Sequence, residues 1–88
     1  MAFLSMNKQD ERKLKLIWDF RGPDAYQTAE HHALHLSEFI KKNSLSLNIT
    51  GFEKMNPEYS LAYLVVFESE MRPVRDALKP HRGQLYQE

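Results

Sequence analysis

The sequence predicts a small α+β fold of the ferredoxin-like type, with the order β-α-β-β-α and a possible final strand. Three observations predict it. Apolar residues alternate with period two in three segments, a long amphipathic helix pattern follows the first segment, and the third segment is apolar on both faces. A right-handed crossover between the first two strands leaves a gap that the third strand fills. We therefore expect an antiparallel sheet covered on one face by two helices.

The first strand is followed by a turn and a long helix. The apolar positions of the strand are Leu14, Leu16, Trp18 and Phe20. Pro23 and Asp24 favour a helix start, and Asp24 with Gln27 fits a capping box. We expect the helix to span residues 23–42 and to end at Asn43.

The next two strands differ in polarity. Residues 44–50 alternate between apolar and polar side chains, which predicts an edge strand. Residues 51–58 contain Asn-Pro and are predicted to form a loop. Residues 59–67 are apolar on both faces, so we expect them to form a central strand.

The two ends of the chain carry weaker signals. Residues 69–79 predict a short helix with Pro73 in its first turn, and residues 84–86 form either a last strand or a tail. Residues 1–11 show no periodicity and are predicted to be a flexible N-terminal segment. A chain of 88 residues suits one core, so residues 12–88 are expected to form a single domain.

Composition excludes several classes of function. Twelve Lys and Arg residues balance twelve Asp and Glu residues, which argues against a nucleic-acid binder and against attachment to an anionic membrane. The absence of Cys rules out disulfides, thiolate nucleophiles and Cys-type zinc sites within this chain. No apolar run approaches the roughly 20 residues of a membrane-spanning helix, so the expected location is the cytoplasm.

Three of the four histidines lie in the predicted first helix. At 100° per residue, the apolar stripe consists of Tyr26, Ala29, Ala33, Leu36 and Ile40. Leu34 falls outside that stripe, and His31, His35 and Glu38 fall nearly opposite it. His32 lies at its border, where a packing histidine with a hydrogen bond is the preferred interpretation.

His31, His35 and Glu38 are candidate metal ligands. Two imidazoles four residues apart lie on adjacent turns and can share one divalent ion, to which Glu38 could add an oxygen. Imidazole ligands favour zinc, nickel or copper over calcium or magnesium. A solvated helix face without any ligand is the preferred alternative, so no cofactor is predicted.

The junction between the first strand and the helix supplies candidate catalytic residues. Asp19 and Arg21, with His32 from the helix, could support acid–base chemistry or grip a polar substrate. We prefer a structural interpretation of this junction. Asp24 would cap the helix and Arg21 would pair with Asp19, which accounts for these charged residues without catalysis.

A cationic patch lies in the C-terminal quarter, at Arg72, Arg75, Lys79, His81 and Arg82. Arginines there could bind phosphates or other anions through forked donors. Neighbouring acidic residues leave an excess of only about one charge, so a solvated helix face is preferred.

The sheet face without helices needs a cover. Tyr59, Tyr63 and Phe67 would lie on that face together with other apolar residues. Contiguous exposed apolar surface usually marks an interface, and a homodimer through the open sheet face is the economical solution. Stacking of RNA bases is the less favoured alternative, because the glycine–aromatic pattern of sheet-surface RNA binders is absent.

Two segments resemble a group of short, uncharacterised bacterial proteins: residues 18–25, WDFRGPDA, and residues 28–36, TAEHHALHL. The resemblance implies a small α+β fold and carries over no catalytic residue. The sequence thus predicts a small soluble homodimeric binding or interaction module without its own catalysis and with an unknown ligand. The alternative is a small enzyme or metal-binding protein using His31, His35 and Glu38, or the junction from Asp19 to Asp24.

Overall fold

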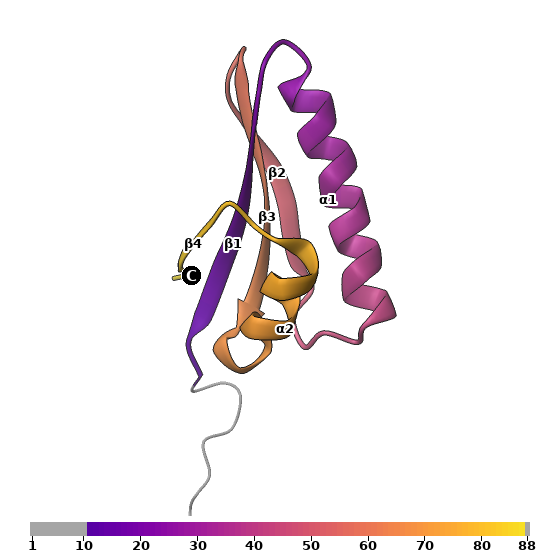
Figure 1. Ribbon diagram of the computed structural model, residues 1–88, viewed down its shortest axis with the longest axis vertical. Coiled ribbons are helices and arrows are strands. Elements are labelled where there is room, and N and C mark those ends of the chain that lie inside the picture. The colour runs from indigo at the N-terminus through magenta and orange to yellow at the C-terminus, as the bar shows by residue number, and fades with distance from the viewer. Residues whose placement is uncertain (1–10, 88) are drawn as a thin grey trace, which may run out of the picture.

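An antiparallel sheet with two helices against it makes up residues 11–87, the part of the chain that the computed structural model describes (Figure 1). The elements are β1 (Lys13–Arg21), α1 (Ala25–Lys42), β2 (Ile49–Asn56), β3 (Tyr59–Phe67), α2 (Glu68–Leu78) and β4 (Arg82–Leu85). The predicted α+β class is therefore confirmed. The predicted flexible segment lies outside the described residues except for Glu11.

The strands are ordered β2-β3-β1-β4, so β3 fills the gap between β2 and β1 as the sequence predicts. β1 and β3 pair over nine residues without interruption, from Lys13 opposite Phe67 to Arg21 opposite Tyr59. β4 pairs with the outer edge of β1. Because β3 is paired on both sides and apolar on both faces, it is the central strand of the sheet together with β1.

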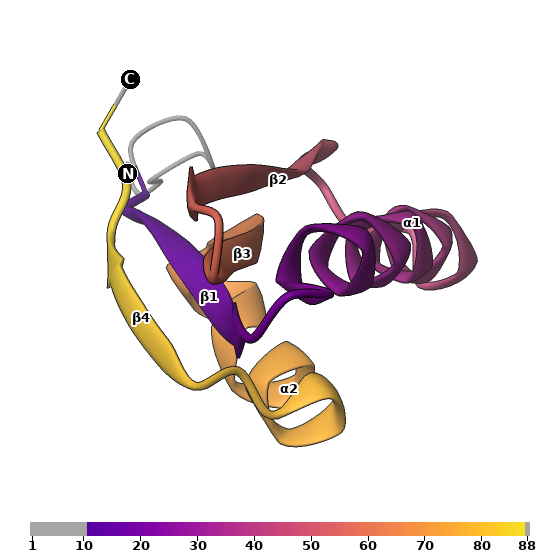
Figure 2. The same ribbon diagram turned by 90° about the horizontal axis from the view of Figure 1, so that it is seen from above.

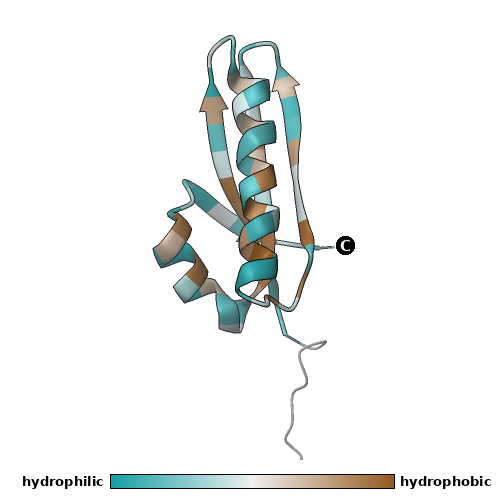
Figure 3. Cartoon of the chain, turned by 90° about the vertical axis from the view of Figure 1, so that its right-hand side faces the viewer, coloured by the Kyte–Doolittle hydropathy of each residue, from teal (hydrophilic) through white to brown (hydrophobic). Residues whose placement is uncertain are grey.

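Both helices pack on one face of the sheet, which Figure 2 shows from above. The core on this face consists of Leu16, Trp18, Ala33, Leu36, Ile40, Ala62, Leu64, Val66 and Val74. Even-numbered positions of β1 and β3 point into it, as the alternation in the sequence requires. Figure 3 looks onto the outer side of α1, where hydrophilic residues recur along the helix. Neither helix in residues 11–87 is long and apolar enough to cross a membrane.

The ends of α1 differ in how well the sequence predicts them. Asn43 is the C-cap, and its Nδ2 donates to the carbonyl oxygen of Phe39 at 3.0 Å. The predicted capping box is wrong: Asp24 is the N-cap residue, but its side chain makes no capping hydrogen bond. Helical residues start at Ala25 because Gly22, with φ of +112°, and the two residues after it form a turn. The buried stripe accordingly begins at Ala25, and Tyr26 is 43% exposed.

The prediction for β2 is wrong in its position. Residues 44–48 belong to the connection after α1, where Ser44 has a positive φ and Ser46 binds Glu70. The strand runs from Ile49 to Asn56, through the segment predicted as a loop. Its glycine fits a strand here because the Tyr63 ring packs on it: a Cβ added at Gly51 would lie 2.7 Å from the Tyr63 hydroxyl.

The turn between β2 and β3 is shorter than the sequence predicts. Asn56 pairs directly with Tyr59, so Pro57 and Glu58 are the two turn residues. The Glu58 backbone N–H donates to the Asn56 side-chain oxygen at 2.8 Å, the side-chain-to-backbone bond that makes Asn suitable for this position. The β2 strand does lie at a sheet edge, as predicted.

The C-terminal third contains two further corrections. α2 begins at Glu68, so Pro73 lies inside the helix and not in its first turn. Lys79, in the left-handed conformation, ends the helix. β4 then occupies residues 82–85, which confirms a last strand; it begins two residues before the predicted 84–86 and ends one residue before it.

On the open face, long side chains shield the apolar row. Ile17 is only 2% exposed although no described helix covers this face. Tyr63 and Arg82 are its direct cross-strand neighbours. The Lys15 ammonium lies 4.4 Å from the centre of the Tyr63 ring, so aromatic and cationic groups lie above the apolar row.

Candidate functional site

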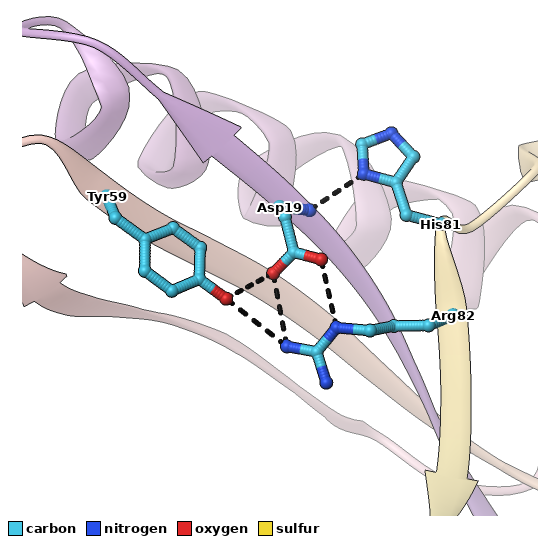
Figure 4. Close-up of polar contacts among 4 residues, drawn as sticks. All are labelled: Asp19, Tyr59, His81 and Arg82. Atoms are coloured by element: carbon cyan, nitrogen blue, oxygen red, sulfur yellow. Dashed lines mark hydrogen bonds and ion pairs between the residues drawn. The ribbon is translucent and has the colours of Figure 1, made fainter.

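Four residues from three strands and the turn before β4 meet around Asp19 of β1 (Figure 4). The Arg82 guanidinium donates two hydrogen bonds to the Asp19 carboxylate, from Nε to Oδ2 at 2.9 Å and from Nη2 to Oδ1 at 3.1 Å. The Tyr59 hydroxyl donates to Oδ1 at 2.5 Å and accepts from Arg82 Nη2 at 3.3 Å. The Asp19 backbone N–H donates to Nδ1 of His81 at 2.9 Å. We call these residues the Asp19 cluster.

Strand register brings the cluster together. Tyr59 begins β3 opposite Arg21, two residues after Asp19 and therefore on the same face. Arg82 begins β4 opposite Ile17, also on that face. His81 precedes Arg82, and its ring instead meets Phe20, whose position belongs to the helix-covered face, at 6.4 Å. The adjacent residues His81 and Arg82 thus contact β1 on opposite faces of the sheet.

The electrostatics of the cluster stabilise the Asp19 carboxylate. Hydrogen bonds from Arg82, joined by that from Tyr59, lower the pKa of Asp19 to about 2 although burial acts in the opposite direction. A carboxylate so engaged is a poor general base, because its acceptor positions are occupied. His81 accepts at Nδ1, so its neutral ring carries the proton on Nε2, which is directed away from this bond.

The candidate catalytic residues are only partly brought together. Arg21 stacks on the Tyr59 ring, with its guanidinium carbon 4.1 Å from the ring centre, and so reaches the Asp19 cluster through Tyr59. His32 contacts the rings of Trp18 and Phe20, at 4.9 and 5.4 Å between centres, on the helix-covered face. The sheet therefore separates His32 from the Asp19 carboxylate.

His32 is partly buried, as its place at the border of the stripe predicts. Its Nε2 atom is buried and has no hydrogen-bond partner, so the expected hydrogen bond at that atom is absent. Burial lowers the pKa of His32, and the neighbouring His35, His81 and His31 lower it further. A neutral packing imidazole is the state that this environment favours.

The other histidines of α1 form an exposed pair. The Nε2 atoms of His31 and His35 are 3.0 Å apart, and the rings lie edge to face. Glu38 lies on the other side of His35, with Oε1 3.4 Å from Nδ1. Within residues 11–87, no group of three or more His, Asp or Glu side chains is arranged around a common metal position.

A cleft of about 590 Å³ opens between α2 and β4. It is lined by Arg12, Leu14, Leu16, Met71, Arg75, Pro80, His81, Arg82, Gly83, Gln84 and Leu85. None of the described residues that line it is acidic. The lining combines apolar side chains of β1, α2 and β4 with three arginines. We call it the α2–β4 cleft.

Sequence reasoning finds the members of these sites but not their arrangement. Arg82 and Tyr59 are recognised only as parts of a cationic patch and an aromatic row, because no local pattern reports the register that joins them to Asp19. Comparisons of this chain with protein-family models, with curated proteins and with solved structures found no match.

Proposed function

We propose that this chain is a small binding module for an organic anion with an apolar body, held in the α2–β4 cleft, and that its fold is ferredoxin-like. The observation that carries the proposal is the lining of the cleft, where apolar walls meet arginines and no described acidic residue. Apolar pockets with a few convergent polar groups are typical of small-molecule sites. A forked arginine donor suits a carboxylate, sulfonate or phosphate head.

Arg75 is the group that we expect to bind the anion. Arg12 is already paired with Glu68, at 2.6 Å between Nη2 and Oε2, and Arg82 is paired with Asp19. Arg75 contacts its own neighbour Asp76 at 3.3 Å or more, and half of its side chain is exposed. A ligand anion can replace so weak a contact at little cost.

The apolar walls of the cleft would bind the apolar body of the ligand, as Arg75 would bind its anionic head. Leu14 and Met71 are partly buried, and Leu85 at the end of β4 is 47% exposed. Covering such surface with an alkyl or aromatic body contributes roughly 25 cal/mol for each Å² removed from water. A purely inorganic anion would leave these walls uncovered.

The test is titration with the fluorescent sulfonate 8-anilinonaphthalene-1-sulfonate and its displacement by octanoate. We expect saturable binding that is weakened about 5- to 10-fold by Arg75→Gln, the loss of one charge-assisted contact at a half-exposed site. Arg72→Gln on the same helix, outside the cleft lining, is the matched control and should bind as the parent does. Octanol, which has the same apolar body without the charge, should compete poorly. Equal binding by the parent and Arg75→Gln would rule out this cleft.

The proposal assigns no catalysis to the chain. It is favoured over a small enzyme at the first strand–helix junction because both oxygens of Asp19 are hydrogen-bonded and His32 lies beyond the sheet. An enzyme using these residues would need the Asp19 carboxylate to exchange protons near neutral pH, which a pKa of about 2 disfavours.

We also propose that the module is a homodimer through its open sheet face. Support comes from Tyr59 and Tyr63, which lie half-buried there, and from Met55, which is 51% exposed at the end of β2. Aromatic residues and methionine are enriched in protein interfaces. Light scattering at micromolar concentration should give twice the mass of the chain, and Tyr63→Glu should halve it. A monomeric mass for the parent contradicts the dimer and leaves the cleft proposal intact.

A further inference from the structure

Two imidazole nitrogens face each other on the outer side of α1, away from the α2–β4 cleft. His31 and His35 are one helical turn apart, and their Nε2 atoms lie 3.0 Å from each other. Both residues are exposed, and an ion can reach the space between them from solvent. We propose that His31 and His35 chelate one divalent transition-metal ion through their Nε2 atoms.

The separation of the two nitrogens matches a metal chelate. Metal–imidazole bonds are about 2.0–2.1 Å long, so two of them to atoms 3.0 Å apart meet at roughly 90–100°. That is the angle between neighbouring ligands in octahedral or square-planar coordination, which nickel(II) and copper(II) adopt. A tetrahedral zinc site needs its nitrogens roughly 3.3 Å apart, so the pair favours nickel or copper.

Glu38 has a different part in this site from the one that its spacing suggests. Its Oε1 lies 3.4 Å from Nδ1 of His35, the nitrogen on the far side of the ring from His31. A carboxylate near that nitrogen favours the tautomer with the proton on Nδ1, which leaves the lone pair of Nε2 available for a metal. Glu38 is therefore a positioning residue for His35 and not a ligand.

The proton between the two rings must move when the ion binds. In the tautomer with the His35 proton on Nδ1, the hydrogen bond between the two rings takes its proton from Nε2 of His31. Coordination replaces this bond: the proton leaves Nε2 of His31, and the ring takes up a proton at Nδ1 from solvent. Water completes the coordination sphere, since the described residues offer no third protein ligand to this position.

The test is calorimetric titration of the tag-free protein with nickel(II) and with copper(II). We expect one ion per chain, with binding weakened at least about 100-fold in His31→Ala and in His35→Ala, because each keeps a single imidazole. Lys41→Ala, which changes an exposed side chain of α1 outside the pair, should bind like the parent. Circular dichroism should show the same fold for all variants, since both altered side chains of the pair are exposed. No binding by the parent, or unchanged binding by His31→Ala/His35→Ala, overturns the proposal.

The part played by Glu38 has its own readout. Glu38→Gln should weaken binding about 10-fold, as is usual for a lost partner of a metal-bound histidine. Electron paramagnetic resonance of the copper(II) complex should show two nitrogen donors and the same spectrum in the parent and in Glu38→Gln. A spectrum that changes in Glu38→Gln would show that Glu38 is a ligand, which contradicts the assignment.

Discussion

Leu36→Ala should lower the free energy of unfolding by about 2–5 kcal/mol, the usual cost of removing a buried leucine side chain and leaving a cavity. Leu36 is 1% exposed and lies in the core between α1 and the sheet. Small domains have about 5–15 kcal/mol of stability in total, so this is a large fraction. Urea unfolding followed by the fluorescence of Trp18, the single tryptophan and 3% exposed, measures the change.

Leu34→Ala is the matched control for this measurement. Leu34 lies two residues earlier on α1 and is 57% exposed. Its replacement removes the same atoms from the surface, and we expect a change within about 0.5 kcal/mol. Similar losses for the two variants would mean that the buried face of α1 is assigned incorrectly.

Asp19→Asn should lower the free energy of unfolding by about 1–2 kcal/mol. The substitution removes the charge that Arg82 and Tyr59 hold, and hydrogen bonds to charged groups contribute more than neutral ones. Arg82 is 46% exposed, so solvent screening keeps the effect below that of a buried ion pair. Asp24→Asn is the matched control: that side chain makes no capping hydrogen bond, and we expect no measurable loss.

The contribution of Asp19 depends on pH with a definite sign. Its pKa is about 2 in the folded chain against an ordinary value of 3.8, so the unfolded chain binds the proton more readily. The stabilisation is complete above about pH 5 and is lost as the pH falls from 4 toward 2. Urea titrations at pH 6 and pH 3 should therefore show a smaller difference between the parent and Asp19→Asn at pH 3. A constant difference would contradict the lowered pKa.

Much of the fold can be predicted from local pattern, and the exceptions have physical reasons. β1 and β3 are recognised correctly because one alternates cleanly and the other is apolar throughout. β2 is misplaced because Leu45 packs against the core from a connecting segment, which imitates a strand position. Gly51 is read as a loop residue because nothing nearby in sequence indicates that the Tyr63 ring covers it.

The sites depend on contacts between distant segments, which local pattern reports poorly. The pairing of His31 with His35 follows from helical periodicity alone, and the structure places the rings in contact. The partners of Asp19 lie 40 and 63 residues further along the chain, so they follow only from the strand register. The α2–β4 cleft similarly requires β4, whose four residues carry almost no strand signal.

Pairing with β1 and the hydrogen bonds of His81 and Arg82 with Asp19 hold β4 in place as one wall of the cleft. All four residues of β4 are exposed, so little apolar burial holds the strand, and its attachment depends on pairing with β1 and on the Asp19 cluster. A terminal strand held in this way can open without unfolding the rest of the chain. The cleft exists only while β4 is paired with β1. Ligand binding in the cleft and slow amide exchange in β4 therefore both report the equilibrium between paired and open β4.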